Sequence, residues 1–395
     1  MQEPLTVAWF SFFPVEWLAD APEEVRRTPK LHPASWQRVL LAELEGNPGL
    51  RLHIIVLRKQ FERSLTFERN GVTFHLVKMP GGLRATTFFW LDTMLIRRVL
   101  LNVKPHVVHA WGTEQGAALV AQRLRYPHVV TMQGLFNWIK EFVPLNRHQR
   151  FASFLERWSL PKAPCITAET GFAAQFLRSR LSCSNVHQVE HAPDWIFHRL
   201  ERRPTLEPLR FVSVASPSYL KGTDLLLKAL DELKAETHFE LRIVGKPEPG
   251  FVDRVRTQVS SELWRQIRFK QDLSPAEVAG ELTQATMVVL PTRVDTSPNS
   301  VKEAVVAGVP VIGSKVGGIP DYVFPGQNGL LFEPNDLSAL TRSLRVACQH
   351  PLFSQGQVEP GALKRVRAYL SPEQMGRRFL ELYGSVAGVN TAMSP

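Results

Sequence analysis

The chain has 395 residues, 44% of them hydrophobic and 21% charged, which suits a globular protein of two domains with sizeable cores. Three scattered cysteines, Cys165, Cys183 and Cys348, show no CxxC spacing and argue against a disulfide framework or a zinc site. No run approaches the roughly 20 apolar residues needed to span a bilayer, and no basic signal segment opens the chain, so we expect a cytoplasmic protein.

The positive charge is concentrated in one region. Residues 51–150 hold 15 Lys and Arg against 5 Asp and Glu. A solvated surface explains part of this excess, and a partner with phosphates or an anionic membrane face would explain its concentration. The basic residues form no stripe with interleaved aromatics, so we expect no nucleic-acid partner.

Strand-like and helical runs alternate along the first half. The expected strands are TVAWFSFF, LRLHIIVL, HVVHAWG and HVVTMQG, and the expected helices are SWQRVLLAEL and EQGAALVAQRL. Apolar strands separated by helices indicate a parallel sheet covered on both faces.

The pattern restarts after the polar segment HRLERRPTLEP (198–208). It runs through LRFVSVAS, GTDLLLKALDEL, FELRIVG, WRQIRFKQ, PAEVAGELTQA, MVVLP, VKEAVVAG, VPVIGS and LSALTRSLRVA. This predicts two doubly wound α/β units. Ligands of such sheets bind at the carboxyl ends of the strands, so we expect substrate in a cleft between the units.

One stretch, VDTSPNSVKEAVVAGVPVIGSKVGGIPDYV (294–323), carries acids around an expected helix start. The run before it, MVVLP, is an expected strand, so Asp295 lies in the loop beyond a strand end. We expect Ser297 to cap the next helix, Pro298 to be its first residue and Gly308 to end it.

The start of this helix is an expected anion site. The N–H groups of Asn299, Ser300 and Val301 have no partner within the helix and lie at the positive end of its dipole. Glu303 follows about one and a half turns further in. Carboxylates bind phosphate poorly but accept hydrogen bonds from sugar hydroxyls, so the expected ligand is an anion flanked by hydroxyls, such as a nucleotide sugar.

At these residues the stretch resembles the family 4 glycosyltransferases, which are retaining enzymes of the GT-B fold. The family pattern is an acid, seven residues, then Glu, followed by Ala-x-x-x-Gly-x-Pro-Val and a Gly-Gly-x-x-Glu/Asp turn. The matching positions are Asp295, Glu303, Ala304, Gly308, Pro310, Val311, Gly317, Gly318 and Asp321. Upstream, Lys221-Gly222 matches the Lys-Gly that reaches the donor diphosphate. KPHVVHAWGTE and VVTMQGL look like family segments of the first half, so the resemblance covers most of residues 100–385.

The resemblance implies an α/β fold of the GT-B class, with two facing Rossmann-like, doubly wound domains and an interdomain cleft. Residues 1–200 would form the acceptor domain, completed by the C-terminal helix (about 372–390), and residues 205–371 the donor domain. The implied activity is transfer of a hexose from a nucleotide-diphosphate sugar to an acceptor hydroxyl with retention, in polysaccharide, lipopolysaccharide or glycolipid synthesis. We expect no cofactor, and no metal either, because the sequence contains no DxD.

The resemblance also implies roles for the donor site. Lys221 and the N–H groups at 299–301 would stabilise charge on the leaving diphosphate, with Gly222 beside them. Glu303 would hold the ribose and Asp295 the transferred sugar.

Two further candidates lie in the first half. His109, at an expected strand end, is either an active-site residue or a satisfied structural histidine. Gln133 stands where the family has a His that helps to position the transferred sugar.

The sequence departs from the family at several positions, and two other functions stay open. Asp295 is one methylene shorter than the usual Glu, and Ala215 or Ser216 replaces an Arg ahead of the Lys. A non-catalytic nucleotide-sugar-binding relative is therefore an alternative. A retaining glycoside hydrolase is a weaker one, because its two carboxylates would have no use for Lys221.

The basic excess falls in the expected acceptor domain, so we predict an anionic acceptor. This would be a lipid-phosphate-linked sugar or a chain held at the inner membrane face, with peripheral association of the protein there. The basic residues proposed to act in this are Arg84, Arg97, Arg98 and Arg125. The neighbouring cluster 88–90, Phe-Phe-Trp, is either core or part of an interfacial helix.

Overall fold

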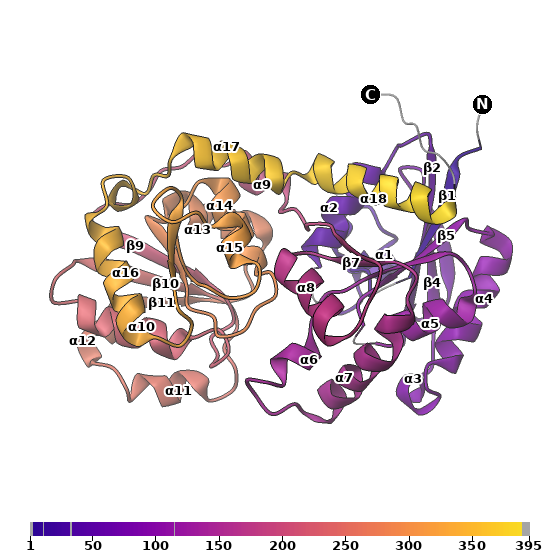
Figure 1. Cartoon of the computed structure of the whole chain (residues 1–395), viewed down its shortest axis with the longest axis horizontal. Coiled ribbons are helices and arrows are strands. Elements are labelled where there is room, and N and C mark those ends of the chain that lie inside the picture. The colour runs from indigo at the N-terminus through magenta and orange to yellow at the C-terminus, as the bar shows by residue number, and fades with distance from the viewer. Residues whose placement is uncertain (1–2, 11, 32–33, 114, 389–395) are drawn as a thin grey trace. The chain divides into compact units, whose positions relative to one another are not determined.

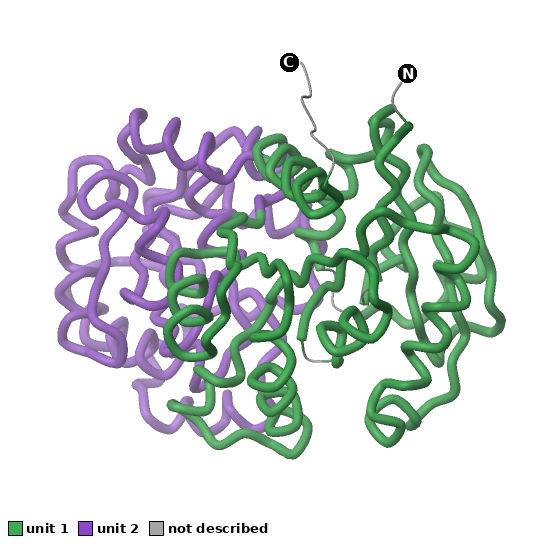
Figure 2. The backbone as a smooth tube through the Cα atoms, turned by 45° about the vertical axis from the view of Figure 1, so that its right-hand side comes forward, with its two compact units in different colours: residues 1–191, 372–395 green, residues 192–371 purple. Residues whose placement is uncertain are grey.

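The computed structural model describes residues 3–10, 12–31, 34–113 and 115–388, and the chain divides into two compact units. Unit 1 comprises residues 1–191 and 372–395, and unit 2 comprises residues 192–371 (Figure 2). Each unit is built on its own sheet.

The described sheet of unit 1 has eight strands in the order β3-β4-β2-β1-β5-β6-β7-β8. Every neighbouring pair is parallel except β3 and β4. The central strands are continuous apolar runs that helices cover on both faces. The strands are β1 Leu5–Phe10, β2 Leu50–Arg58, β3 Leu65–Arg69, β4 Val72–Lys78, β5 Val107–Trp111, β6 His128–Thr131, β7 Ile166–Ala168 and β8 Val186–Gln188.

The antiparallel hairpin β3–β4 was not predicted. Its turn residues Asn70 and Gly71 both have positive φ, 47° and 78°, as a two-residue hairpin turn requires. An Asn-Gly pair between two alternating runs is the sequence signal of this hairpin.

The helices of unit 1 include one from the far end of the chain (Figure 1). They are α1 Glu23–Arg26, α2 Ser35–Leu44, α3 Leu83–Thr86, α4 Trp90–Val103, α5 Ala117–Leu124, α6 Phe136–Ile139, α7 Arg147–Ser159, α8 Gly171–Arg180 and α18 Pro372–Ala387. Helix α18 packs on α2, and the Trp9 indole donates to the Tyr383 hydroxyl at 2.9 Å. Residues 389 and 390, the end of the expected final helix, lie outside the described residues.

The described sheet of unit 2 has six parallel strands in the order β11-β10-β9-β12-β13-β14. They are β9 Leu209–Val214, β10 Phe239–Val244, β11 Ile267–Lys270, β12 Met287–Leu290, β13 Val311–Ser314 and β14 Gly329–Phe332. The helices are α9 Trp195–His198, α10 Thr223–Leu233, α11 Phe251–Arg256, α12 Ser261–Arg265, α13 Pro275–Gln284, α14 Asn299–Ala307, α15 Ile319–Tyr322, α16 Leu337–Gln349 and α17 Pro360–Tyr369. One core forms between the sheet and α10 and α16, and another between the sheet and α9, α13 and α14.

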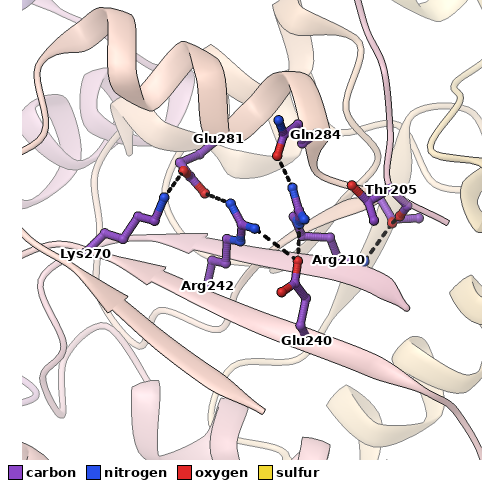
Figure 3. Close-up of polar contacts among 8 residues, drawn as sticks. Thr205, Arg210, Glu240, Arg242, Lys270, Glu281 and Gln284 are labelled. Carbon is purple, nitrogen blue, oxygen red and sulfur yellow. Dashed lines mark hydrogen bonds and ion pairs between the residues drawn. The ribbon is translucent and has the colours of Figure 1, made fainter. Parts of the chain in front are cut away.

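A row of charges lies between α13 and the strands beneath it (Figure 3). Glu281 of α13 accepts from Arg242 at 3.0 Å and from Lys270 at 2.5 Å. Arg242 lies 3.3 Å from Glu240, which also pairs with Arg210. Alternating signs let these half-buried groups satisfy one another, so the row fixes α13 on the sheet.

The polar segment 198–208 belongs to unit 2. The Arg202 guanidinium donates to the carbonyls of Ala285 at 2.6 Å and Gly356 at 3.0 Å, and the Arg203 amide donates to Thr283 at 2.9 Å. These contacts agree with the division of the chain, in which unit 2 comprises residues 192–371.

No helix in the described parts of the chain combines the length and apolar character that crossing a bilayer requires.

Candidate active site

Lys221 lies in the loop that leaves β9 at the carboxyl edge of the unit 2 sheet. Its amide donates to the Ser218 hydroxyl at 3.2 Å, and its side chain stays partly exposed. Gly222 has φ of 69°, and a Cβ there would stand 1.9 Å from the Pro291 carbonyl oxygen. Only glycine allows this close approach, which sets Lys221 beside the loop that follows β12.

The Lys221 ammonium group forms an ion pair with the Asp295 carboxylate. The second Asp295 oxygen accepts from the Ser297 amide at 3.2 Å. A Cβ at Gly317 would stand 1.9 Å from the Asp295 carbonyl oxygen. The Gly-Gly turn therefore packs directly against the loop that carries Asp295. Asp295 is the residue expected to bind the transferred sugar, and both of its carboxylate oxygens already have partners in the protein, Lys221 and the Ser297 amide.

The start of α14 differs from the prediction. The capping position is Pro298 and no side chain caps the helix, so Ser297 as the cap was wrong. The Ser297 hydroxyl is instead buried and has no hydrogen-bond partner among the described residues. The helix ends as expected, with Gly308 in the left-handed conformation.

Two backbone amides remain available at this helix start. The Val301 amide already donates to the Pro298 carbonyl at 3.1 Å. Asn299 and Ser300 have no hydrogen-bond acceptor among the described residues and are partly exposed. The anion site at α14 therefore consists of two free amides rather than the three expected. Lys221 is linked to this helix start by its ion pair with Asp295.

Glu303 lies on α14 in an environment that disfavours its charge. Burial raises the pKa of the Glu303 carboxyl to about 7, with Lys302 opposing this shift and Asp194 adding to it. Asp194 caps α9 by accepting from the Ile196 amide at 3.0 Å. A carboxyl that titrates near neutrality suits a group whose partners arrive with a ligand.

Arg293 was missed by the sequence analysis and organises the site. Its guanidinium binds both Asp224 oxygens, at 2.7 and 2.8 Å, and donates to Asn335 at 2.8 Å. It also lies 3.9 Å from the centre of the Tyr219 ring. Arg293 thus clamps the loop that carries Lys221, and its position two residues before Asp295 was the available signal.

The unit 1 candidate His109 is a structural residue. Its side chain is fully buried, and its ring nitrogens lie 2.6 Å from the hydroxyls of Tyr383 and Thr131. Burial, with His191 nearby, holds the pKa of His109 well below its usual range. Both nitrogens are engaged by the core, so a catalytic role for His109 is not supported.

Gln133 lies beyond β6 and lines a cavity within unit 1. Outside the gaps at 1–2, 11, 32–33, 114 and 389–395, no three His, Cys, Asp or Glu side chains gather as a metal site would require. Independence of metals stays a prediction.

The chain is similar to known proteins over both units. The family model of Glycosyltransferase Family 4 matches residues 40–194, and that of Glycosyl transferases group 1 matches residues 208–350. A D-inositol 3-phosphate glycosyltransferase of Nocardioides is 31% identical over 180 residues, which cover 42% of this chain and 39% of that protein. The match therefore spans well under half of that relative.

Solved structures share the fold over nearly the whole chain. A sucrose-phosphate synthase of Thermosynechococcus elongatus has a TM-score of 0.77 at 17% identity, covering 97% of this chain and 99% of that one. HepE of Anabaena in complex with UDP-glucose has a TM-score of 0.70 at 13% identity, covering 96% and 100%. These matches and the two parallel-sheet units confirm the predicted GT-B class. The chain belongs to glycosyltransferase family 4.

Proposed function

We propose that the chain transfers a hexose from a nucleotide-diphosphate sugar to an acceptor hydroxyl, with retention at the anomeric carbon. The observation that carries this proposal is that Asp295 links Lys221 to the start of α14 by an ion pair and a hydrogen bond. Lys221 pairs with Asp295, and Asp295 accepts from the amide of Ser297, two residues before the free amides begin. One ammonium group and two amides therefore converge on one anion-binding place.

The chemistry follows from charge. When the bond between the sugar and the diphosphate breaks, negative charge develops on the leaving diphosphate. Lys221 and the amides of Asn299 and Ser300 would stabilise it, as donors aimed at developing charge do. These groups supply that stabilisation from the protein, so we propose that transfer needs no divalent metal.

The other two acids divide the donor between them. Glu303 would accept hydrogen bonds from the ribose hydroxyls, which would favour its ionised form. Asp295 would bind a hydroxyl of the transferred sugar once the diphosphate shares Lys221. HepE, with the same fold, was solved with UDP-glucose, which supports a nucleotide sugar as the donor class here.

A non-catalytic nucleotide-sugar-binding protein is the second candidate. The observation that favours it is the Lys221–Asp295 ion pair, because it engages two of the proposed catalytic groups with each other. Arg293 does not replace the Arg that the family has ahead of the Lys, since Asp224 and Asn335 hold its guanidinium.

We also propose a cytoplasmic protein that associates with the inner face of a membrane, with a role in polysaccharide, lipopolysaccharide or glycolipid synthesis. One stripe of α4 carries exposed apolar groups, Trp90 at 53%, Met94 at 65% and Leu101 at 64%, together with Arg97 and Arg98. These five residues, called the α4 stripe below, share one face because they recur every three or four positions. Apolar side chains among arginines suit an anionic lipid surface.

Two other residues of the predicted basic and aromatic set lie elsewhere. Arg84 pairs with the buried Asp92, so its charge is not available to an anionic partner. Phe89 of the aromatic cluster 88–90 is buried, whereas Trp90 is exposed.

The test of the function is incubation with a panel of nucleotide sugars, without acceptor, in the presence and absence of EDTA. We expect slow hydrolysis of one donor, unchanged by EDTA. Transfer to an added acceptor should keep the anomeric configuration by NMR. Tight binding of a nucleotide sugar with no turnover would favour the non-catalytic candidate, and strict dependence on magnesium would refute metal independence.

A further inference from the structure

A chain of hydrogen-bonded side chains joins α18 to the sheet of unit 1, and the proposed donor chemistry does not use it. Its members are Trp9 of β1, His109 of β5, Thr131 of β6, Thr167 of β7 and Tyr383 of α18, and all are fully buried. Trp9 is the register partner of His109, and Thr131 is that of Thr167, so each pair points to one face of the sheet. Helix α18 contacts β5 and β6. The chain therefore crosses four neighbouring strands and includes a side chain of the helix that packs on them.

The hydrogen bonds run without a gap from Trp9 to Thr167. The Trp9 indole nitrogen lies 2.9 Å from the Tyr383 hydroxyl, which lies 2.6 Å from His109 Nδ1. His109 Nε2 lies 2.6 Å from the Thr131 hydroxyl, which lies 2.5 Å from the Thr167 hydroxyl. Because all these groups are closed off from solvent, each proton has to find its acceptor within the protein.

The order of the protons along the chain follows from Trp9. An indole nitrogen can only donate, so the Tyr383 hydroxyl accepts from Trp9 and its own proton is left to donate to His109 Nδ1. Neutral His109 then carries its proton on Nε2 and donates to Thr131, and Thr131 donates to Thr167. The other tautomer would aim a second donor at the Tyr383 oxygen and leave the Tyr383 proton without an acceptor in the chain. The contacts therefore select the tautomer with the proton on Nε2.

Protonation of His109 disrupts this order. The cation carries N–H groups on both ring nitrogens, so its Nδ1–H and the Trp9 indole would both donate to the Tyr383 oxygen. The Tyr383 proton would then be buried without its acceptor, which is costly. The closed chain is complete only with neutral His109.

The surroundings of His109 also oppose its charge. The titratable groups that face it are the Tyr383 phenol of α18 and His191 beyond β8, and His191 in turn lies 3.4 Å from Glu169. The other rings in contact with His109 are those of Trp9, Trp111 and Phe379. Burial, with His191 as the second cause, holds the pKa of His109 well below its usual range. Burial raises the pKa of Tyr383 well above its usual range, so the phenol keeps its proton.

We propose that this hydrogen-bonded chain is an acid-sensitive latch that fastens α18 to unit 1, closed by neutral His109 and opened when His109 binds a proton. The proton comes from solvent and binds Nδ1, the atom to which Tyr383 donates in the closed state. Opening would withdraw Tyr383 from the sheet and let the imidazolium be hydrated. Because α18 begins directly after unit 2 ends at residue 371, the latch would control the attachment of the last segment of the chain to unit 1. The latch needs no nucleotide sugar, so it does not rest on the proposed function.

The test is hydrogen exchange on the full chain, with the amides of α18 followed between pH 7 and pH 5. Rates are expressed as protection factors, which remove the intrinsic pH dependence of exchange. Opening that takes up one proton has an equilibrium constant that rises about tenfold per pH unit below the ordinary His pKa of about 6.5. The protection of α18 should therefore fall by about tenfold from pH 6 to pH 5. The amides of α13 in unit 2 are the internal reference and should not show this fall.

Two variants assign the proton to His109. His109→Gln cannot take up a proton, so its α18 protection should be independent of pH, whatever its absolute value. The matched control is His148→Gln, which removes an exposed histidine of α7 in the same unit and should keep the wild-type fall.

NMR spectra of the wild-type chain with 15N-labelled histidine cover the case in which His109→Gln does not fold. The two tautomers of a neutral imidazole differ in the nitrogen that carries the proton, and the spectra distinguish them. The His109 signals are identified by their through-space contacts to Tyr383. We expect the proton on Nε2 at pH 7.

The latch is refuted if the protection of α18 does not depend on pH, if His109→Gln keeps the wild-type dependence, or if His109 carries its proton on Nδ1. It is refuted equally if the amides of β2 lose protection in step with those of α18, because unit 1 would then be unfolding as a whole. Donor hydrolysis enters none of these measurements, so failure of the latch and failure of the proposed function are distinguishable.

Discussion

Lys221 and Asp295, 74 positions apart in the sequence, form an ion pair beside the start of α14. The carboxylate holds the ammonium group in place while no anion is bound. A donor diphosphate must share Lys221 with Asp295 or displace it. Asp295 therefore competes with the donor diphosphate for Lys221. Substitution of Lys221 and substitution of Asp295 should consequently have different effects on donor binding and turnover.

Lys221→Ala should lower kcat by about 10²–10³-fold at saturating donor, because it removes a charged donor to the leaving group. Initial rates of donor hydrolysis measure this. The matched control is Lys364→Ala, which removes an exposed lysine of α17 and should keep full activity. Full activity of the Lys221 variant would show that the diphosphate is stabilised elsewhere.

Asp295→Asn should have opposite effects on binding and turnover. Removing the competing charge should tighten nucleoside diphosphate binding by about two- to fivefold, the value of a partly exposed ion pair. Turnover should fall, because the sugar loses its carboxylate. Titration calorimetry on Lys221→Ala, Asp295→Asn and the double variant isolates the coupling. Equal effects of Asp295→Asn with and without Lys221 would contradict the competition.

Donor binding should strengthen with pH near neutrality. The pKa of Glu303 is raised to about 7, and ribose hydroxyls bind best to the ionised carboxylate. Affinity for a nucleotide sugar, whose phosphates do not titrate in this range, should therefore rise up to about tenfold from pH 6 to 8. Glu303→Gln should bind more weakly at pH 8 and lose the pH dependence. A Gln variant with the wild-type profile would place the titrating group elsewhere.

The raised pKa of Glu303 also makes the stability of the folded chain depend on pH. Because the folded pKa of Glu303 lies above its ordinary value of 4.5, the folded chain binds more protons between pH 4.5 and 7. The contribution of Glu303 to the free energy of unfolding therefore falls as pH rises through that window. Chemical unfolding at several pH values should show a smaller fall in Glu303→Gln.

The charged row beneath α13 should stabilise unit 2 above mildly acidic pH. Although burial alone would raise it, the pKa of Glu281 is lowered by hydrogen bonds from Lys270 and Arg242. Glu281 therefore stabilises the folded state at pH values above its ordinary pKa of 4.5, and this stabilisation is lost as pH falls through its lowered pKa in the folded chain. Glu281→Gln should cost about 1–3 kcal/mol at pH 7, a buried pair discounted for the partly exposed Lys270. Glu333→Gln, in an exposed pair with Lys315, should change the free energy of unfolding by less than about 0.5 kcal/mol.

The α4 stripe should bind anionic vesicles. Arg97→Glu with Arg98→Glu should abolish sedimentation with such vesicles while sparing donor hydrolysis. Wild-type binding should fall steeply with salt, since exposed charges are screened beyond about 8 Å at physiological ionic strength. The control is Arg180→Glu on α8, a helix that contacts the edge strand β8, and this variant should bind normally. Unchanged binding by the double variant would leave the basic excess as a matter of solubility.

The alternation of the sequence predicted most of the fold, because apolar runs and helix periods are local properties. It did not reveal the β3–β4 hairpin, although Asn70-Gly71 carried the signal. Nor did it place the start of α14, where Pro298 occupies the capping position. Proline is compatible both with the capping position and with the first helical position. Residue type alone therefore could not distinguish a helix that starts at Pro298 from one that starts at Asn299.

The motif singled out Lys221, Asp295 and Glu303 as candidates but could not show that the first two pair. That contact depends on Gly222 and Gly317, whose missing side chains let three loops approach closely. The burial of His109 depends on Tyr383, which comes from the other end of the chain. Contacts at such separations follow from tertiary packing and leave no local pattern.

The hydrogen bond between Trp9 and Tyr383 bears on the order in which the protein matures on the ribosome. Residues 192–371 are synthesised in full before the helix that fills the core of unit 1. Unit 2 can therefore finish folding while unit 1 still exposes the apolar surface that Phe379 and Tyr383 will cover, the reverse of the usual N-terminal-first order. A released chain that ends at residue 371 would hold the complete sequence of unit 2 and a unit 1 that lacks its last helix.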